Sequence, residues 1–388
     1  MIAQAVARAL TAPAGNDTTF AMSVPSSGET PDAALEGLRA KIDELDHKIV
    51  TLLNDRARIV VEIGKVKQQH NAPIYSPDRE KMVLDKVRKL NGGPLPDRCL
   101  EAVYRELMSG SFALEKPLRI GFLGPTGTFS HWASVQKFGS SVTHVPLADI
   151  PSVFDEVVRG HIDYGLVPVE NSLHGGVIDT LDAFLNSSAR ICAEVKVTIH
   201  HNLLARDPWE QIKTIYSKPE VFSQCRKWLS AMAKDRDVQP AASTSKAAEL
   251  ASQNSGVAAI GSKLACQFHG LRVLYENIED DPDNETRFFV IGREGARKTG
   301  DDKTAIMFTT AHKPGALAEV LDVFKENGIN LTDIEKRPSK KVNWEYYFFI
   351  DAQGHQDDEN MRKAISEARQ HCLQLTALGS YPRATEVL

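Results

Sequence analysis

The chain has 388 residues, a formal net charge of −5, 42% hydrophobic residues and 25% charged residues. At roughly 100–200 residues per domain, this length predicts two to four domains. The acidic balance disfavours a nucleic-acid-binding surface, which usually carries a basic excess. No apolar run reaches the ~18 residues of a membrane helix. The five cysteines are odd in number and form no C-x-x-C pair, which favours a reducing compartment and argues against a disulfide framework or zinc ribbon.

The first 31 residues are rich in Ala, Ser, Thr and Pro and are expected to form a disordered tail. An alternative is an over-long start, with Met22 as the real first residue. A signal peptide is disfavoured because the apolar stretch is short, carries Arg8 and lacks a clear hydrophobic core segment.

The next segment is predicted to be helical. Apolar residues recur at spacings of three, four and seven from residue 35, up to a break at Asn71-Ala72-Pro73. A helix of some 35 residues would be about 50 Å long, too long for one short domain to cover, so a partner chain is expected along it. Further helices are predicted from Ser76-Pro77-Asp78 to about Leu90, and over about 97–115. The apolar positions of the long helix include Leu38, Ile42, Leu45, Ile49, Leu52, Ile59, Ile63 and Val66.

From Leu118 onward, short β-rich runs alternate with helical runs. The strands are RIGFLG, VTHVPL, YGLVPVEN, IKTIYS, VAAIGS and RFFVIG. This alternation predicts an α/β domain of two lobes with a largely parallel sheet and a cleft. After the linker EGARKTGDDK, strands TAIMFTT, INLTDIEKR, WEYYFFIDA and LQLTALGSY and helices over 314–327 and 357–371 give the order βαββαβ, an α+β ferredoxin-like unit.

Charges on the long helix fall into a geometric pattern. Arg56 and Lys67 are 11 residues apart, so at ~100° per residue they lie within about 20° of one another. Arg39 precedes Arg56 by 17 residues, roughly 100° round the helix and ~25 Å away. One straight helix cannot aim all three at one site, but a second antiparallel copy could supply Arg39. Such a cluster would suit a small dianion; a solvated polar face is the alternative interpretation.

LEGLRAKIDELDHKIVTLLNDRARIVVEIGKVK and PIYSPDREK resemble the all-helical chorismate mutase domain over residues 32–116. The resemblance implies an intertwined dimer and a cofactor-free rearrangement of chorismate to prephenate. Lys67 and Glu115 would be catalytic, with Glu115 protonated so that it can donate to the ether oxygen, and Glu80 would bind the substrate hydroxyl. Ser76 varies in the family and receives no role. The implied chorismate contacts are Arg39 from the partner chain, Arg56, Lys67, Arg79, Glu80, Ser111 and Glu115.

Four stretches of the α/β segment each read as a cap or turn when taken alone. Together, IGFLGPTGTFSHWA, VPVENSLHGGV, STSKAA and Thr286-Arg287-Phe288 resemble prephenate dehydratase over residues 117–296. The resemblance implies loss of water and CO2 from prephenate to give phenylpyruvate, with Thr286 assisting departure of the ring hydroxyl and Arg287 holding a carboxylate. Lys218 stands where relatives often have His, so its role is left open. The implied prephenate contacts are Thr128, Ser130, Glu170, Asn171, Ser172, Gln224, Ser243, Thr244, Ser245, Thr286, Arg287 and Phe288.

HKPGALAEVLDVF and INLTDIEKRP resemble an ACT domain of the type that binds phenylalanine, over residues 302–388. Such domains usually pair edge to edge with the ligand at the interface, and Lys336 stands where the family more often has Ser. The implied effector contacts are Gly315, Ala316, Leu317, Asn330, Leu331, Glu335, Arg337 and Pro338.

These resemblances together imply a cytoplasmic bifunctional enzyme of phenylalanine biosynthesis. It would be at least a homodimer that acts on chorismate and prephenate, responds to phenylalanine, and needs no cofactor, metal, nucleic acid or membrane. One alternative is a non-catalytic two-lobed binding protein with an amino-acid sensor domain. Another is a helical oligomerisation arm on a single enzyme. Thr286-Arg287-Phe288 and the spacing of Arg56 and Lys67 argue against the first.

Overall fold

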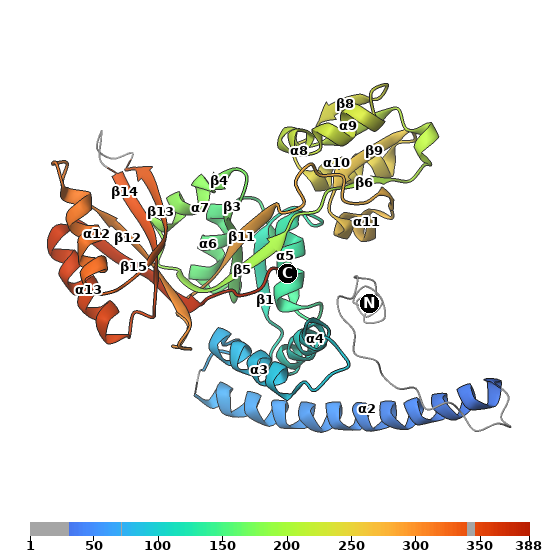
Figure 1. Ribbon diagram of the computed structural model, residues 1–388, viewed down its shortest axis with the longest axis horizontal. Helices are drawn as coiled ribbons and strands as arrows, with labels where there is room; N and C mark the ends of the chain where they lie inside the picture. The colour runs from blue at the N-terminus through green and yellow to red at the C-terminus, as the bar shows by residue number, and fades with distance from the viewer. Residues whose placement is uncertain (1–30, 71, 340–345) are drawn as a thin grey trace. The chain divides into compact units, whose positions relative to one another are not determined.

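The described chain begins with three helices, as the sequence predicts. The computed structural model describes residues 31–70, 72–339 and 346–388, so the predicted tail, Met22 and the start of a strand at Trp344 lie outside the described residues. Helix α2 (Pro31–Gln69) has 39 residues and is about 58 Å long. It is followed by α3 (Pro77–Leu90) and α4 (Asp97–Glu115), and Figure 1 shows α2 as one continuous helix.

The described residues leave most of the apolar stripe of helix α2 uncovered. Its buried residues are Val60 and Gly64. A Cβ on Gly64 would lie 3.0 Å from Cγ of Glu115, so glycine lets α4 approach closely at that point. No described helix has the length and apolar composition needed to span a membrane. The apolar side chains with at least 45% exposure include Leu38, Ile42, Leu45, Ile49, Leu52, Ile59, Ile63 and Val66.

The described chain divides into two compact units. One contains residues 31–75 and 86–117, and the other contains residues 76–85 and 118–388. The second unit holds two α/β lobes and the C-terminal α+β unit, and the first lobe and the C-terminal unit share one set of buried side chains.

The sheet of the first lobe has the strand order β2-β1-β3-β11-β5, with β4 added on β3. Strand β1 is parallel to β2 and β3, whereas β11 is antiparallel to both β3 and β5. The elements are β1 (Arg119–Leu123), α5 (Phe129–Phe138), β2 (Thr143–Leu147), α6 (Ile150–Arg159), β3 (Tyr164–Asn171), β4 (Gly175–Gly176), α7 (Ile178–Phe184), β5 (Arg190–Thr198) and β11 (Glu285–Gly292).

The second lobe is inserted between β5 and β11 and has the strand order β10-β6-β9-β7-β8. Only β7 with β8 and β7 with β9 are parallel pairs there. The predicted largely parallel sheet is therefore wrong for both lobes, because strands β6 and β11, at the two crossings between lobes, pair antiparallel to their neighbours. The elements are β6 (Asn202–Ala205), a 3-10 turn (Trp209–Gln211), β7 (Thr214–Ser217), α8 (Pro219–Gln224), α9 (Arg226–Met232), β8 (Asp237–Pro240), α10 (Thr244–Gln253), β9 (Val257–Gly261), α11 (Lys263–His269) and β10 (Arg272–Tyr275).

The C-terminal unit has the predicted βαββαβ order. Its four strands form an antiparallel sheet in the order β13-β14-β12-β15. The elements are β12 (Asp302–Thr309), α12 (Ala316–Glu326), β13 (Leu331–Pro338), β14 (Tyr346–Gln353), α13 (Glu359–His371) and β15 (Gln374–Pro382).

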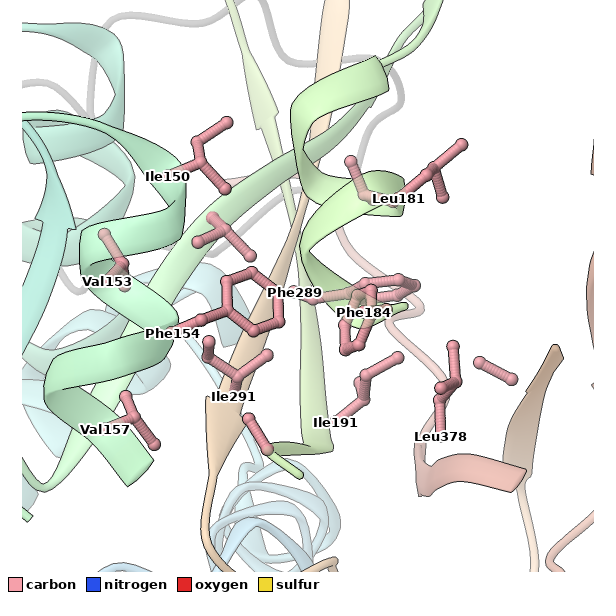
Figure 2. Close-up of a cluster of buried hydrophobic side chains, with 14 of the residues drawn as sticks. Ile150, Val153, Phe154, Val157, Leu181, Phe184, Ile191, Phe289, Ile291 and Leu378 are labelled. Atoms are coloured by element: carbon pink, nitrogen blue, oxygen red, sulfur yellow. The ribbon is translucent and has the colours of Figure 1, made fainter. Parts of the chain in front are cut away.

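Alternate residues of this C-terminal sheet enter two different cores, as the two-residue period of a strand requires. Ile306 and Ile350 pack with helices α12 and α13. Met307 and Phe349 instead join the core of the first lobe, together with Leu378. Figure 2 shows part of that shared cluster, including Leu378 and side chains of the first lobe. Both faces of the C-terminal sheet are therefore buried, one of them against the α/β unit.

Gly379 of β15 lies close to strand β5 of the first lobe. A Cβ at this position would lie 2.2 Å from the carbonyl oxygen of Ile191 in β5. We expect Gly379→Ala to lower the free energy of unfolding by about 1–3 kcal/mol, as overpacking does elsewhere. Urea unfolding followed by fluorescence would measure this. Gly295→Ala is the matched control, because no atom lies within 4 Å of its added Cβ. Equal stability of the two variants would contradict the close packing.

Candidate active sites

Four predicted site residues come together on the facing helices α2 and α4. An Nη of Arg56 donates to Oγ of Ser111 at 2.9 Å. Further along α2, Nζ of Lys67 donates to Oε2 of Glu115 at 2.9 Å and to the carbonyl oxygen of Ile74 at 2.8 Å. The predicted shared face of Arg56 and Lys67 is confirmed. The result is a polar group of two cations, a hydroxyl and a nearly buried carboxylate between the two helices.

The other predicted residues of the helical segment lie elsewhere. Arg39 is exposed on the first part of α2, where the helix makes few contacts within this chain. Arg79 is exposed in the first turn of α3. Glu80 is buried and forms an ion pair with Nζ of Lys137 from α5 at 2.7 Å, a contact within the second compact unit.

In the α/β unit, the turn between β1 and α5 is fixed to the second lobe. Oγ of Ser245, at the start of α10, donates to the carbonyl oxygen of Thr126. Ser262 donates in the same way to the carbonyl oxygen of Gly127 at 2.8 Å. Gly127 has φ +89°, and a Cβ there would lie 3.2 Å from Oγ of Ser245. Two of the four signature stretches, one from each lobe, therefore meet through backbone carbonyls and buried hydroxyls.

Thr128, Ser130 and the Ser243–Ser245 stretch lie at helix starts. The Oγ1 of Thr128 caps α5 by accepting from the backbone N–H of His131 at 3.3 Å. Ser243 caps α10 in the same way with the N–H of Lys246 at 2.9 Å. Ser130, Thr244 and Ser245 are buried. These positions serve as caps and lobe contacts whatever further role they have.

The other two signature stretches meet through Asn171 and Thr286. Oδ1 of Asn171 accepts from the backbone N–H groups of Leu173 and His174 at 3.1 and 3.2 Å, which fixes the orientation of the amide. Its Nδ2 therefore points at Oγ1 of Thr286, at 2.9 Å, and at Oδ1 of Asn284, also at 2.9 Å. Because the Thr286 oxygen accepts this bond, its O–H remains able to donate to another group.

A chain of side chains links this point to the second lobe. Gln224 of α8 lies 3.0 Å from Nε2 of His174 through its Nε2, and 2.6 Å from Nε2 of His201 through its Oε1. Burial lowers the pKa of His201, and its Gln224 and Glu279 neighbours only partly oppose this. Among the described residues, Nδ1 of His201 and Nδ2 of Asn284 are buried atoms without a hydrogen-bond partner.

The sequence analysis missed three members of this network. His174 stands inside the quoted stretch VPVENSLHGGV, and Asn284 stands two residues before Thr286. Their positions in the sequence could therefore have indicated that they lie near Asn171 and Thr286. His201 follows β5 with no motif of its own, and only the fold brings it to Gln224.

The neighbours of Asn171 and Thr286 face the opposite side of the sheet. Glu170 and Arg287 are opposed in the β3–β11 pairing and line a cavity of about 330 Å³ beside the C-terminal unit. Ser172 accepts at Oγ from the backbone N–H of Glu285 at 3.0 Å on that same side. Phe288 is 1% exposed and packs in the interior. The twelve predicted prephenate contacts are thus divided between two faces, and their roles stay predictions. The cavity is lined by Glu170, Ser172, Lys196, Glu285, Arg287, Lys303, Thr332 and Asp333.

The predicted effector residues occupy the start of α12 and the edge strand β13. Gly315 has φ +83° and begins α12, with Ala316 buried and Leu317 packed against the helix core. The carbonyl oxygen of Asn330 accepts from the N–H of Gln353 at 2.9 Å, and Leu331 opens β13.

Two residues of β13 contact the first lobe directly. Nε and Nη2 of Arg337 donate to the two carboxylate oxygens of Asp182 in α7, both at 3.1 Å. A Cβ on Gly176 would lie 2.9 Å from Oε1 of Glu335. Pro338 ends the strand. The edge strand is therefore both a predicted effector segment and a contact with the segment that follows Asn171 and Ser172.

Comparison with known families assigns most of the described chain. The chorismate mutase type II family matches residues 38–116, the prephenate dehydratase family matches residues 120–296, and the ACT domain family matches residues 304–370.

Similar proteins cover the same order of segments. The chain is 42% identical over 355 residues to the bifunctional chorismate mutase/prephenate dehydratase of Aquifex aeolicus, which covers 90% of this chain and 98% of that protein. The structure of an Arthrobacter aurescens prephenate dehydratase in complex with L-Phe has a TM-score of 0.65 and 36% identity over 69% of this chain and 90% of that chain. A further structure, described as a quorum quenching acylase, has a TM-score of 0.64 and 26% identity over 69% and 98% of the two chains.

His131 of α5 gives the site a pH-dependent element. Its Nδ1 accepts from the N–H of Gly127 at 3.1 Å, and burial, with a smaller contribution from His144, lowers its pKa to about 4. Between about 4 and the ordinary value near 6.5, the unfolded chain binds a proton that the folded chain does not, so stability falls as pH falls through this window. We expect His131→Gln to reduce the dependence of the unfolding free energy on pH, measured by urea unfolding from pH 7 to pH 4. A slope equal to that of the unmodified protein would contradict this role.

Proposed function

We propose that this chain, which belongs to the family of bifunctional chorismate mutase/prephenate dehydratases, rearranges chorismate to prephenate and then converts prephenate to phenylpyruvate. The C-terminal ACT domain makes the second reaction sensitive to phenylalanine. The observation that carries the dehydratase assignment is the bond from Asn171 to Thr286, which leaves the threonine O–H free to donate. The helical segment, which precedes the dehydratase domain in the same order as in the relatives, favours this function over a binding protein.

In the mutase, the residues on α2 and α4 act by position and charge. Arg56 and Lys67 would hold the two carboxylates and the ether oxygen of chorismate in a compact conformer, with Ser111 and Glu115 beside them. The rearrangement moves electrons within one molecule, so it needs no nucleophile. Glu115 is the ion-pair partner of Lys67 in the free chain. A protonated Glu115 that donates to the ether oxygen would therefore have to exchange that contact when chorismate binds.

A second copy of the chain would complete this site. The exposed apolar side chains of α2, ten of them at least 45% exposed, call for a covering surface. An antiparallel α2 from a partner would cover the stripe and bring the exposed Arg39 to the Arg56–Lys67 group. We therefore assign chorismate contacts to Arg56, Lys67, Ser111 and Glu115 of one chain and Arg39 of the other, while the roles of Arg79 and Glu80 rest on the family resemblance alone.

In the dehydratase, the Thr286 hydroxyl would donate to the departing ring hydroxyl of prephenate. Asn171 holds the threonine oxygen, and Gln224 connects the two lobes across the same region. The unpartnered buried nitrogens of His201 and Asn284 are further polar groups that a bound substrate or water would satisfy. Loss of the hydroxyl with CO2 makes the ring aromatic, so modest assistance from a weak acid such as threonine is enough.

Phenylalanine would bind at the start of α12 and along β13, where the effector residues predicted from the ACT resemblance lie. The cytoplasm is the compartment we propose, because all five cysteines are free and a reducing environment keeps them so.

The two activities should separate by mutation. Purified protein incubated with chorismate alone should form prephenate and then phenylpyruvate, identified by chromatography and mass spectrometry. Thr286→Ala removes the donor, so prephenate should accumulate while chorismate consumption continues at the unmodified rate. The expected loss of dehydratase turnover is at least about a hundredfold, the lower end for loss of a general acid.

Thr286→Ser is the control for this variant, because it retains a hydroxyl at the same position. It should retain much of the dehydratase activity that Thr286→Ala loses. Loss of both activities in a folded Thr286→Ala protein, or unimpaired phenylpyruvate formation, would reject the assignment.

The shared mutase site can be tested by mixing two inactive variants. Arg39→Ala and Lys67→Ala should each inactivate the mutase alone. In a mixed dimer, one site receives both defects and the other receives neither. Random pairing makes about half of the dimers mixed, so roughly a quarter of all sites should be intact, as two-fold symmetry requires.

Recovery is measured as chorismate consumption after the two proteins are unfolded and refolded together, with separately refolded proteins combined afterwards as the control. Activity near a quarter of the unmodified level supports Arg39 acting across the dimer. If mixed dimers form but the mixture stays inactive, Arg39 acts within its own chain.

A further inference from the structure

Arg287 makes an unusual set of contacts for a residue beside a catalytic position. It is 8% exposed, and its Nε donates to Oε2 of Glu194 in β5 at 2.8 Å. Its Nη2 donates to Oδ2 of Asp351 in β14 and to the hydroxyl of Tyr381 in β15 at 3.1 Å. Three strands from two different domains are thus tied together by one guanidinium.

The C-terminal side of this cluster is itself connected. The Tyr381 hydroxyl donates to Oδ1 of Asp351 at 3.0 Å, so the two partners of Arg287 also hold one another. On the other side, Nζ of Lys303 in β12 lies 3.3 Å from Glu194. Burial acts to lower the pKa of Arg287, but Tyr381, Asp351 and Glu194 together raise it above the ordinary arginine value. The guanidinium is therefore firmly charged, with Nε and Nη2 hydrogen-bonded to protein groups and Nη1 at 3.7 Å from Oε2 of Glu170.

Thr286 lies directly before Arg287 on the same strand and faces the other way. Its hydroxyl oxygen accepts from Asn171, whereas Arg287 faces the C-terminal domain. The pairing of β11 with β3 shifts register between Arg287 and Phe288. Such irregularities redirect side chains and are common beside functional sites. A displacement of the Arg287 side chain would turn the strand at the residue that carries the Thr286 hydroxyl.

We propose that Arg287 is a positioning residue that couples the C-terminal domain to Thr286, so that phenylalanine slows the dehydratase by altering the Arg287–Asp351–Tyr381 contact. This proposal rests on the proposed function. It differs from the expectation drawn from the family resemblance, in which Arg287 holds a carboxylate of prephenate. An effector that binds at β13 or α12 can change a distant site only if it favours one of two conformations of the C-terminal domain. We propose that these conformations differ in the contact of Arg287 with Asp351 and Tyr381.

The test uses the full-length protein and changes the C-terminal partner of Arg287. Asp351→Asn keeps the size of the side chain and removes its charge. Dehydratase kcat should fall with little change in KM for prephenate. The phenylalanine concentration for half inhibition should rise at least about fivefold, the lower end of ordinary allosteric coupling. Arg287→Lys, which loses the forked geometry, should give the same pattern.

The matched control is Asp301→Asn, which removes a carboxylate of the same domain whose partner is the exposed Arg383. Its dehydratase kinetics and phenylalanine response should equal those of the unmodified protein. Phenylalanine binding, measured directly by calorimetry, should persist in Asp351→Asn, so that loss of inhibition reports loss of coupling. Hydrogen exchange of the β11 peptide on addition of phenylalanine gives a readout independent of turnover, and its response should shrink in Asp351→Asn.

Two results would overturn the proposal. One is an Arg287→Lys protein with raised KM and normal inhibition, together with an Asp351→Asn protein of normal kcat, which is the pattern of a substrate clamp. The other is normal coupling in Tyr381→Phe if Asp351→Asn fails to fold, since the lost hydroxyl bonds both Arg287 and Asp351. An unmodified protein that does not convert prephenate would instead reject the proposed function, and the exchange experiment would still decide the coupling.

Discussion

The alternation of side chains along β11 is the constraint on which the second compact unit depends. This strand lies between β3 and β5, so both of its edges are paired and its position is fixed by two neighbours. Successive residues of a strand must face opposite sides of the sheet. Thr286 therefore meets Asn171 on one side, while Arg287 meets Asp351 and Tyr381 on the other. The proposed catalytic hydroxyl of Thr286 and a contact with the C-terminal domain are separated by one peptide bond, which makes independent movement of the two sides difficult.

The helical unit works under a different constraint, because it is incomplete alone. Helix α2 buries only Val60 and Gly64 along its 39 residues, and no other described part of the chain covers its apolar stripe. Arg56 and Lys67 are nevertheless already placed against α4 through Ser111 and Glu115. One chain thus preorganises part of the proposed mutase site. The polar network of the dehydratase domain, from Thr286 through Asn171 and His174 to Gln224 and His201, is instead assembled within a single chain.

The spacing of residues along the sequence correctly predicted those features of the fold that depend on residues close together in the chain. The three helices, the common face of Arg56 and Lys67 and the βαββαβ order all follow from periodicity and breakers. Strand β5 was missed although its second half, Glu194-Val195-Lys196-Val197, alternates polar and apolar residues. The antiparallel return of β11 depends on an inserted lobe that no local pattern reveals. The contacts of Arg287 with Asp351 and Tyr381, like that of His201 with Gln224, join segments far apart in the chain, so spacing could not indicate them.

The C-terminal sheet, like β11, has different contacts on its two faces, and this bears on regulation. A ferredoxin-like sheet covered by helices on one face leaves the other face open, and here that face packs against the first lobe. Only the edge strands β13 and β15 then remain for pairing with another copy. Along β13, Glu335 and Arg337 point toward the first lobe, while Ile334, directly before Glu335, is 49% exposed. An effector bound at this edge would touch strand β13, whose inward residues already contact the segment after Asn171. The same strand could therefore both bind the effector and pass its effect to the first lobe.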